Sequence, residues 1–246
     1  MHIRHFSILL LVTLMAAGCG AVNRSIQIAD GEVVDGDVRN VNGAIHIGSN
    51  CTISGDVRNV NGAINVGAGT RLNQLRNTNG SIELGAETEV ASVRSTNGRI
   101  RIGQGAAVSE NVSNTNGAIE LAKEVTVGGN VETTNGPLRV AEGSRIGGKA
   151  SSLNGPIVLT AARAGDIIGA NGSIELLDGT VVDGEIHVRE TRGTVSSGTP
   201  RIILGRNVVV EGPIRIEREV QLYIHESART GEISGAEPIS FSGDRP

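Results

Sequence analysis

The sequence predicts an all-β chain folded as a single-stranded parallel β-helix, a three-sided solenoid with about 18–19 residues per coil. Three observations support this fold class. The dipeptide Asn-Gly recurs at spacings of 17 to 19 residues, apolar residues keep a fixed register to it, and aromatic residues make up only 1% of the chain. Buried rings remove large apolar areas from water in ordinary cores. Their near absence indicates a narrow aliphatic core of regular shape.

Asn-Gly marks one corner of each predicted coil. Both residues tolerate the left-handed backbone that a sharp corner needs. Stacked Asn side chains can also hydrogen-bond along the axis of the coil. We therefore expect a structural corner ladder formed by Asn42, Asn61, Asn79, Asn97, Asn116, Asn135, Asn154 and Asn171.

Apolar columns divide each coil into three short strands. Paired aliphatic residues such as Ile45 and Ile47 follow the corner Gly, share one strand face and point inward. Further apolar positions follow later in the repeat, as at Ile53 and Val57. Asn-Gly is also a hairpin signal, but antiparallel pairing would place identical repeats in opposite environments. We therefore expect about ten or eleven parallel coils, stacked into a rod of roughly 50 Å.

Residues 1–18 are typical of the signal peptide of a bacterial lipoprotein. Arg4 supplies positive charge, and the apolar stretch that follows it is too short to span a bilayer comfortably. The small residues before Cys19 resemble a lipobox, in which the Cys is acylated and becomes the first residue of the mature chain. The resemblance implies a lipid anchor at Cys19, and Gly20 favours the outer membrane. The alternative is an ordinary signal peptide, cut at the same small residues.

The rest of the chain divides by the regularity of its repeat. Residues 19–24 form a tether, 25–190 the regular coils, 191–239 degenerate terminal coils and 240–246 a tail that we expect to fray. No amphipathic segment that would cap the solenoid is evident. Unpaired backbone groups at the coil ends leave end-to-end association open.

Candidate catalytic and metal-binding residues are sparse. The sequence has no nucleophile–base signature, phosphate loop or zinc spacing. His46, His187 and His225 lie many coils apart, and Cys51 stands in a column of small residues that we expect to fill the core. We predict no catalytic residue, metal or cofactor. With a net charge of −4 and no basic block, a nucleic-acid partner has little support.

One surface column carries like charges. Arg39, Arg58, Arg76 and Arg94 each follow an inward residue and stack in successive coils. Like charges on neighbouring strands are destabilising. The side chains therefore either splay into water or serve an anionic partner, such as lipid headgroups, lipopolysaccharide phosphates or an acidic polymer.

The repeat resembles that of the bactofilins, a polymer-forming cytoskeletal family. The similarity rests on residues 43–48, Gly-Ala-Ile-His-Ile-Gly, and 55–57, Gly-Asp-Val, and it extends over roughly residues 25–190. It implies a right-handed β-helix that polymerises end to end without nucleotide and acts as a scaffold. The chain is also similar to β-helical putative adhesin repeats of bacterial envelopes.

Together these patterns predict a non-enzymatic scaffold protein of the bacterial envelope. We expect a lipid anchor in the outer membrane, with self-association through the coil ends. One alternative is an adhesin-like module that binds an anionic polymer through the Arg ladder. Another is a degenerate carbohydrate-active β-helix enzyme.

Overall fold

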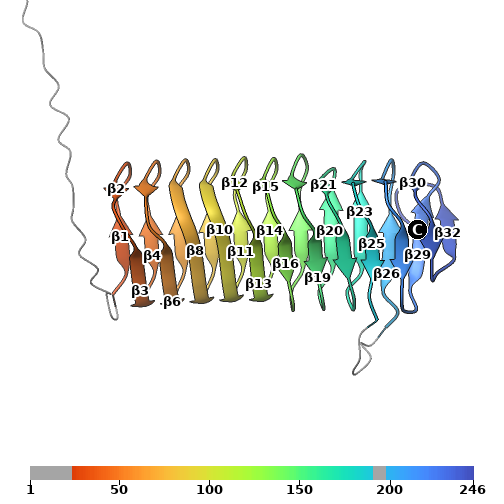
Figure 1. Ribbon diagram of the computed structural model, residues 1–246, viewed down its shortest axis with the longest axis horizontal. Coiled ribbons are helices and arrows are strands. Elements are labelled where there is room, and N and C mark those ends of the chain that lie inside the picture. Colours follow the sequence, from red (N-terminus) through yellow and green to blue (C-terminus); the bar gives the residue numbers. More distant parts are fainter. Residues whose placement is uncertain (1–23, 191–197) are drawn as a thin grey trace, which may run out of the picture.

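The computed structural model describes residues 24–190 and 198–246, and every regular element in them is a β-strand. The strands form a rod of parallel coils (Figure 1). The predicted all-β parallel β-helix is confirmed, with about 11 turns. The predicted signal peptide and Cys19 lie outside the described residues.

The first side of the rod is a sheet with one strand from each coil. Each strand pairs in parallel with its counterpart one coil away, as Ile45 does with Ile64. In spatial order the strands are β1 (Ile26–Ile28), β4 (Ile45–Ile47), β7 (Ile64–Val66), β9 (Ile82–Leu84), β11 (Ile100–Ile102), β14 (Ile119–Leu121), β17 (Leu138–Val140), β20 (Ile157–Thr160), β23 (Ile174–Leu177), β26 (Arg201–Leu204), β29 (Gln221–His225) and β32 (Pro238–Phe241).

The second side is a narrow sheet of mostly two-residue strands. Its separate strands are β2 (Val33–Val34), β5 (Thr52–Ile53), β12 (Ala107–Val108), β15 (Thr126–Val127), β18 (Arg145–Ile146), β21 (Arg163–Ala164), β24 (Val181–Val182), β27 (Val209–Val210) and β30 (Arg229–Thr230). Two long strands, β8 (Arg71–Asn79) and β10 (Glu89–Asn97), run from this side into the third.

The third side ends at the Asn-Gly corner and carries the Arg column. It consists of the later parts of β8 and β10 together with β3 (Val38–Asn42), β6 (Val57–Asn61), β13 (Val112–Asn116), β16 (Val131–Thr133), β19 (Ala150–Ser152), β22 (Ile167–Gly169), β25 (Ile186–Val188), β28 (Ile214–Ile216) and β31 (Ile233–Ser234).

Aliphatic columns fill the interior. Ile45, Ile64 and Ile82 are fully buried and stack in direct register on one another. Cys51 is also buried, and its thiol lies 3.1 Å from the carbonyl oxygen of Ala29. The expectation that Cys51 fills the core is therefore confirmed.

The corner glycines bring successive coils together backbone to backbone. A Cβ placed on Gly136 would lie 1.9 Å from the carbonyl oxygen of Gly117. Because that oxygen belongs to the main chain, no side chain can rotate away to make room. Gly117 also has a φ of 139°, which disfavours any other residue. The close stacking of the coils thus requires Gly at this corner.

The terminal coils extend past the predicted boundary at residue 239. Strand β32 continues to Phe241, two residues into the segment expected to fray. Its pairing with β29 and an edge-on contact of the Phe241 ring with His225, at 5.1 Å between centroids, hold it there. In the part of the chain that the structure describes, no helix has the length and apolar character to cross a bilayer.

Candidate binding surface

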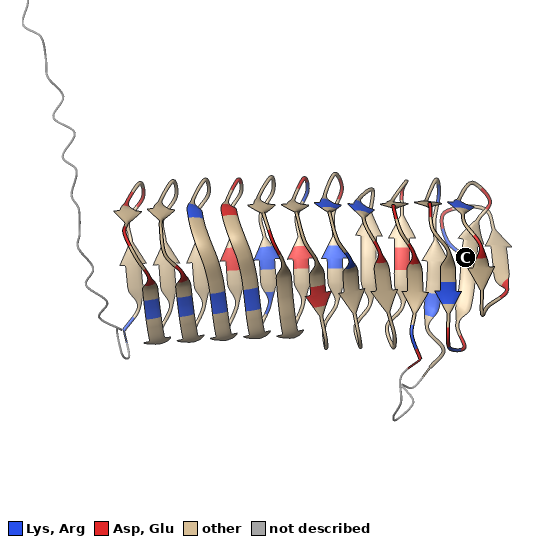
Figure 2. Cartoon of the chain, in the orientation of Figure 1, with Lys and Arg blue, Asp and Glu red and all other residues tan. Residues whose placement is uncertain are grey.

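The outer surface of the third sheet brings the four predicted Arg residues together. Strand alternation turns the residue after each inward Val or Leu toward solvent. Arg39 pairs in register with Arg58, Arg58 with Arg76, and Arg76 with Arg94. Figure 2 shows them as blue bands on β3, β6, β8 and β10.

The four guanidinium groups differ in their partners. Arg39 forms an ion pair with Asp37, and Arg58 forms one with Asp56 at 2.7 Å. These two carboxylates offset the charge of the first half of the ladder.

The second half of the ladder contacts only neutral acceptors. Arg76 donates to Oε1 of Gln74 at 2.8 Å, and Arg94 donates to Oγ of Ser113 at 3.2 Å. Among the described residues, no carboxylate lies within ion-pair distance of either guanidinium. The positive charge of the ladder is therefore most available at Arg76 and Arg94.

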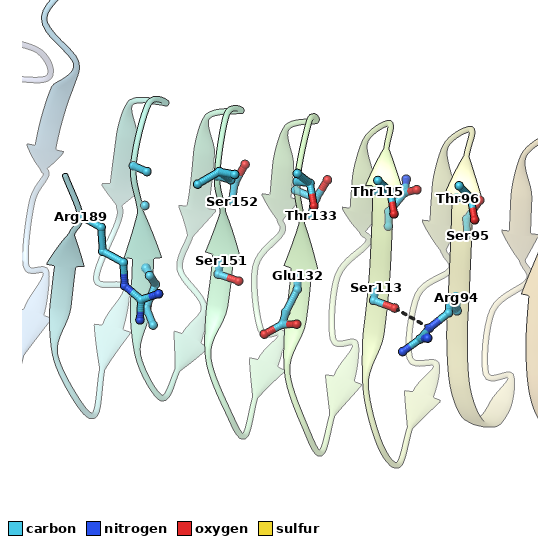
Figure 3. A pocket seen from close by; sticks show the side chains of 16 residues that line it. Arg94, Ser95, Thr96, Ser113, Thr115, Glu132, Thr133, Ser151, Ser152 and Arg189 are labelled. Atoms are coloured by element: carbon cyan, nitrogen blue, oxygen red, sulfur yellow. Dashed lines mark hydrogen bonds between the residues drawn. The ribbon is translucent and has the colours of Figure 1, made fainter. Parts of the chain in front are cut away.

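A groove begins where the ladder ends. Past Arg94, the same outward column continues in register as Ser113, Glu132, Ser151 and Ile168. The shorter side chains of this column lower the surface, and the groove encloses about 490 Å³ (Figure 3).

Hydroxyl groups line the groove. A second column, nearer the Asn-Gly corner, contributes Thr96, Thr115 and Thr134, and then continues as the exposed Leu153 and the buried Ala170. Three successive coils therefore place a Thr hydroxyl at the same position of the repeat.

The polar residues beneath the groove are held by the corner backbone. Asn114 donates to the carbonyl oxygen of Gly98 at 2.7 Å. The hydroxyl of Ser152 donates to the carbonyl oxygen of Gly136 at 3.0 Å. Both side chains are buried and belong to the groove lining. These hydrogen bonds therefore fix the polar side chains beneath the groove without any ligand.

Cationic side chains stand at both ends of the groove. Arg94 lies at one end, and Figure 3 shows Arg189 at the other, with Glu132 between them. The carboxylate of Glu132 is 2.7 Å from Nζ of Lys149, which offsets its charge. Arg189 forms no ion pair within the described chain, although its charge helps to lower the pKa of Glu217. The groove therefore has a polar half beside Arg94, a more apolar half at Leu153, Ile168 and Ala170, and an Arg at each end.

The corner asparagines lie in one line beside this groove. In seven consecutive bonds of 2.6 to 2.9 Å, Nδ2 of each Asn donates to Oδ1 of the Asn one coil earlier. The line runs from Asn42 to Asn171. There Arg218 donates to Oδ1 of Asn171 at 2.6 Å and to the carbonyl oxygen of Ala170 at 3.0 Å.

A second, buried asparagine column was missed in the sequence. Asn40, Asn59, Asn77 and Asn114 lie two residues before the corner Asn and point inward, where their Nδ2 atoms donate to backbone carbonyls near the corner. The repeated pattern Asn-x-Asn-Gly was the available signal. Strand alternation already required the first Asn to share the inward face of the preceding aliphatic residue.

The histidines remain separate. His46 is 3.2 Å from Nδ2 of Asn65, and Nε2 of His187 is 2.8 Å from Glu217. The hydrogen bond with His187 is the main cause that lowers the pKa of Glu217. No group of three or more metal-ligating side chains occurs in residues 24–190 and 198–246.

Comparisons with known proteins add no family assignment. No family model matches the chain, and neither the curated proteins nor the solved structures contain a significant match. The similarity to bactofilins is therefore supported at the level of the parallel β-solenoid alone.

Proposed function

We propose that the chain is a non-enzymatic structural rod of the bacterial envelope, anchored by lipid at Cys19 and joined to other copies through its first coil. The observation that carries this proposal is the difference between the two ends of the rod. In the first sheet, the first described coil has Ile26 and Ile28 at its inward positions, whereas the last coil has Pro238 and Ser240 there.

The first coil has the composition of an interior coil. Its inward residues include Ile26, Ile28 and Val38, and no described strand pairs with the outer edges of β1, β2 and β3. In β32 the corresponding inward positions hold Pro238 and Ser240. Proline lacks a backbone N–H, and such residues are typical of edges that avoid further pairing. Association through the first coil is therefore favoured.

Analytical ultracentrifugation and negative-stain microscopy of the full chain in detergent test the association. We expect assemblies that dissociate when Ile28→Lys places a charge on the first coil. The matched change at the other end, Ser240→Lys, should leave them intact. Isolated wild-type rods at high concentration would overturn the proposed association.

Metabolic labelling with a fatty acid tests the anchor. The chain has two cysteines, Cys19 and Cys51. Cys19→Ser should abolish incorporation and release the protein from membranes, because acyl chains contribute about 0.8 kcal/mol per buried CH₂. Cys51→Ser is the matched control and should keep the label. Equal labelling of both variants would exclude an anchor at Cys19.

A second function, binding of an anionic polymer, is favoured by the Arg residues that lack carboxylate partners. Arg76 and Arg94 project their guanidinium groups from adjacent coils, and such groups bind carboxylate and phosphate well. A pull-down with anionic glycans tests it. Binding that survives the triple change of Arg39, Arg58 and Arg76 to Ser would exclude the first three Arg residues as the site.

A further inference from the structure

We infer that the groove between Arg94 and Arg189 binds a linear acidic polysaccharide laid along the rod axis. This inference names a site and a ligand class for the second function above and rests on it. It shifts the binding site from the four-Arg ladder to the groove that starts at the ladder's last member.

The shape of the groove suits an extended chain. Its lining runs from β10 across β13, β16, β19 and β22 to the residue that follows β25. Five coil spacings of about 4.8 Å make this about 24 Å. One coil spacing is close to the length of one sugar unit in an extended polysaccharide. The three coils that carry Thr96, Thr115 and Thr134 can therefore offer a hydroxyl to each of three successive sugars.

The lining provides the hydrogen bonds that a sugar chain requires. Thr96, Thr115 and Thr134 repeat one hydroxyl per coil, and Ser113 and Ser151 lie in the neighbouring column. A hydroxyl group both donates and accepts. A hydroxyl-rich ligand can therefore find partners at several successive coils without a change in the sheet.

The charges select an acidic polymer. Arg94 and Arg189 stand at opposite ends, and Lys149 offsets the single carboxylate of the lining, that of Glu132. A guanidinium group can form two parallel hydrogen bonds to one carboxylate. A polyuronate long enough to reach both ends would place a carboxylate at each Arg.

Other linear polymers fit this surface less well. No aromatic residue lines the groove, so a nucleic acid would lack the rings on which bases stack. The strands beneath the groove already pair with both neighbouring coils. An extended peptide therefore could not add main-chain hydrogen bonds to this sheet as it does at a free edge.

Isothermal titration of the full chain in detergent with oligogalacturonates of increasing length tests the inference. We expect affinity to rise with length until the oligomer spans the groove. Neutral cello-oligosaccharides of equal length should bind at least about tenfold more weakly, because they lose charge-assisted hydrogen bonds. Polyglutamate that binds as well as the oligogalacturonates would overturn the choice of a polysaccharide.

Variants locate the site. Arg94→Gln and Arg189→Gln should each weaken binding about tenfold through loss of one carboxylate contact. The matched control is Arg145→Gln, because Arg145 is exposed on the narrow second side. Ser113→Leu tests the groove without a change of charge, and it should block binding because the larger side chain fills the groove. We expect the fold to accept it, since the same column already holds an apolar residue at Ile168. Thermal unfolding of each variant verifies that the rod is intact.

Two results separate the failure of this inference from failure of the second function. If the ladder triple variant loses binding while both groove Arg variants and Ser113→Leu retain it, the groove is excluded and the ladder is the site. If wild-type protein binds no acidic polymer, both proposals fail. Loss of binding in the groove variants alone supports the inference.

Discussion

The coils before Gly172 and those after residue 198 share one backbone register but differ at their corners. The earlier coils turn at Asn-Gly, with a hydrogen-bonded line of asparagines. Closely stacked glycines occur in both regions, as at Gly155 and Gly212. The later coils turn through more variable charged segments, such as residues 217–220, yet β26 and β29 continue the first sheet without a shift. The aliphatic columns and strand pairing thus maintain the coil in both regions, while the residues at the Asn-Gly corner are free to change.

The largest expected effect compares two glycines at the corner that follows the first-sheet strand, one from each region: Gly103 after β11 and Gly205 after β26. A Cβ on Gly103 would lie 2.5 Å from the carbonyl carbon of Gly85, whereas on Gly205 the nearest atom, the carbonyl oxygen of Leu176, is 3.1 Å away. Gly103→Ala should lower the free energy of unfolding by about 3 kcal/mol, as overpacking does. Gly205→Ala should cost less than about 1 kcal/mol. Equal losses in urea unfolding would show that the two corners pack alike.

Removal of one asparagine from the corner line should have the next largest effect. Asn116 donates to Asn97 at 2.8 Å and accepts from Asn135 at 2.7 Å. Asn116→Ala breaks both bonds and should cost about 2 kcal/mol at roughly 1 kcal/mol each. Asn73→Ala, at an exposed site away from the corner, is the control for thermal unfolding. If Asn116→Ala loses no more stability than the control, the line of corner asparagines contributes only to the register of the coils.

Arg218 should stabilise the later region alone. Its guanidinium group joins residues 170 and 171 of the regular coils to the segment after β28. Arg218→Gln should cost about 1 kcal/mol, since the Gln amide can retain one of the two hydrogen bonds. Hydrogen exchange should show faster opening of β28 and β29 and no change in β4 to β14. Arg229→Gln serves as a nearby exposed control, and uniform destabilisation of the rod would contradict a local role.

The smallest expected effect is on the pH dependence of amide exchange in the first coils. The backbone N–H of Asp56 and then the Arg39 guanidinium lower the pKa of Asp37. A lowered folded-state pKa means that the carboxylate stabilises the first coils above its ordinary range, and that this contribution is lost as pH falls through the lowered value. Exchange of the Asp56 amide should therefore accelerate only below the usual aspartate range. Asp37→Asn should remove that pH dependence, since Asn111 already accepts the equivalent bond in a later coil.

The sequence was sufficient for the fold because the repeat leaves few alternatives. With Val38 and Val57 inward, alternation alone places Arg39 beside Arg58 on the outer surface. Period and alternation also require the interior position of Asn40 and its counterparts, but a pattern of aliphatic columns does not indicate that a polar side chain fills such a position.

The groove and the Arg218 contact could not be predicted in the same way. The groove depends on the relative sizes of side chains in successive coils, from Arg94 to the small Ser113, and on Arg189, which falls just outside the regular strands. Arg218 reaches back 47 residues to Asn171. No periodic pattern specifies a contact between an irregular segment and a repeat, so this contact needs coordinates.

The uniform register also makes the length of the molecule adjustable in whole steps. Ile100 pairs with Ile119, and Ile119 pairs with Leu138, one repeat further along. Deletion of residues 117–135 would bring Ile100 opposite Leu138, a pair of the same shape and chemistry. Gain or loss of single repeats during evolution would therefore change the reach of the protein by about 4.8 Å at a time while its cross-section stays the same.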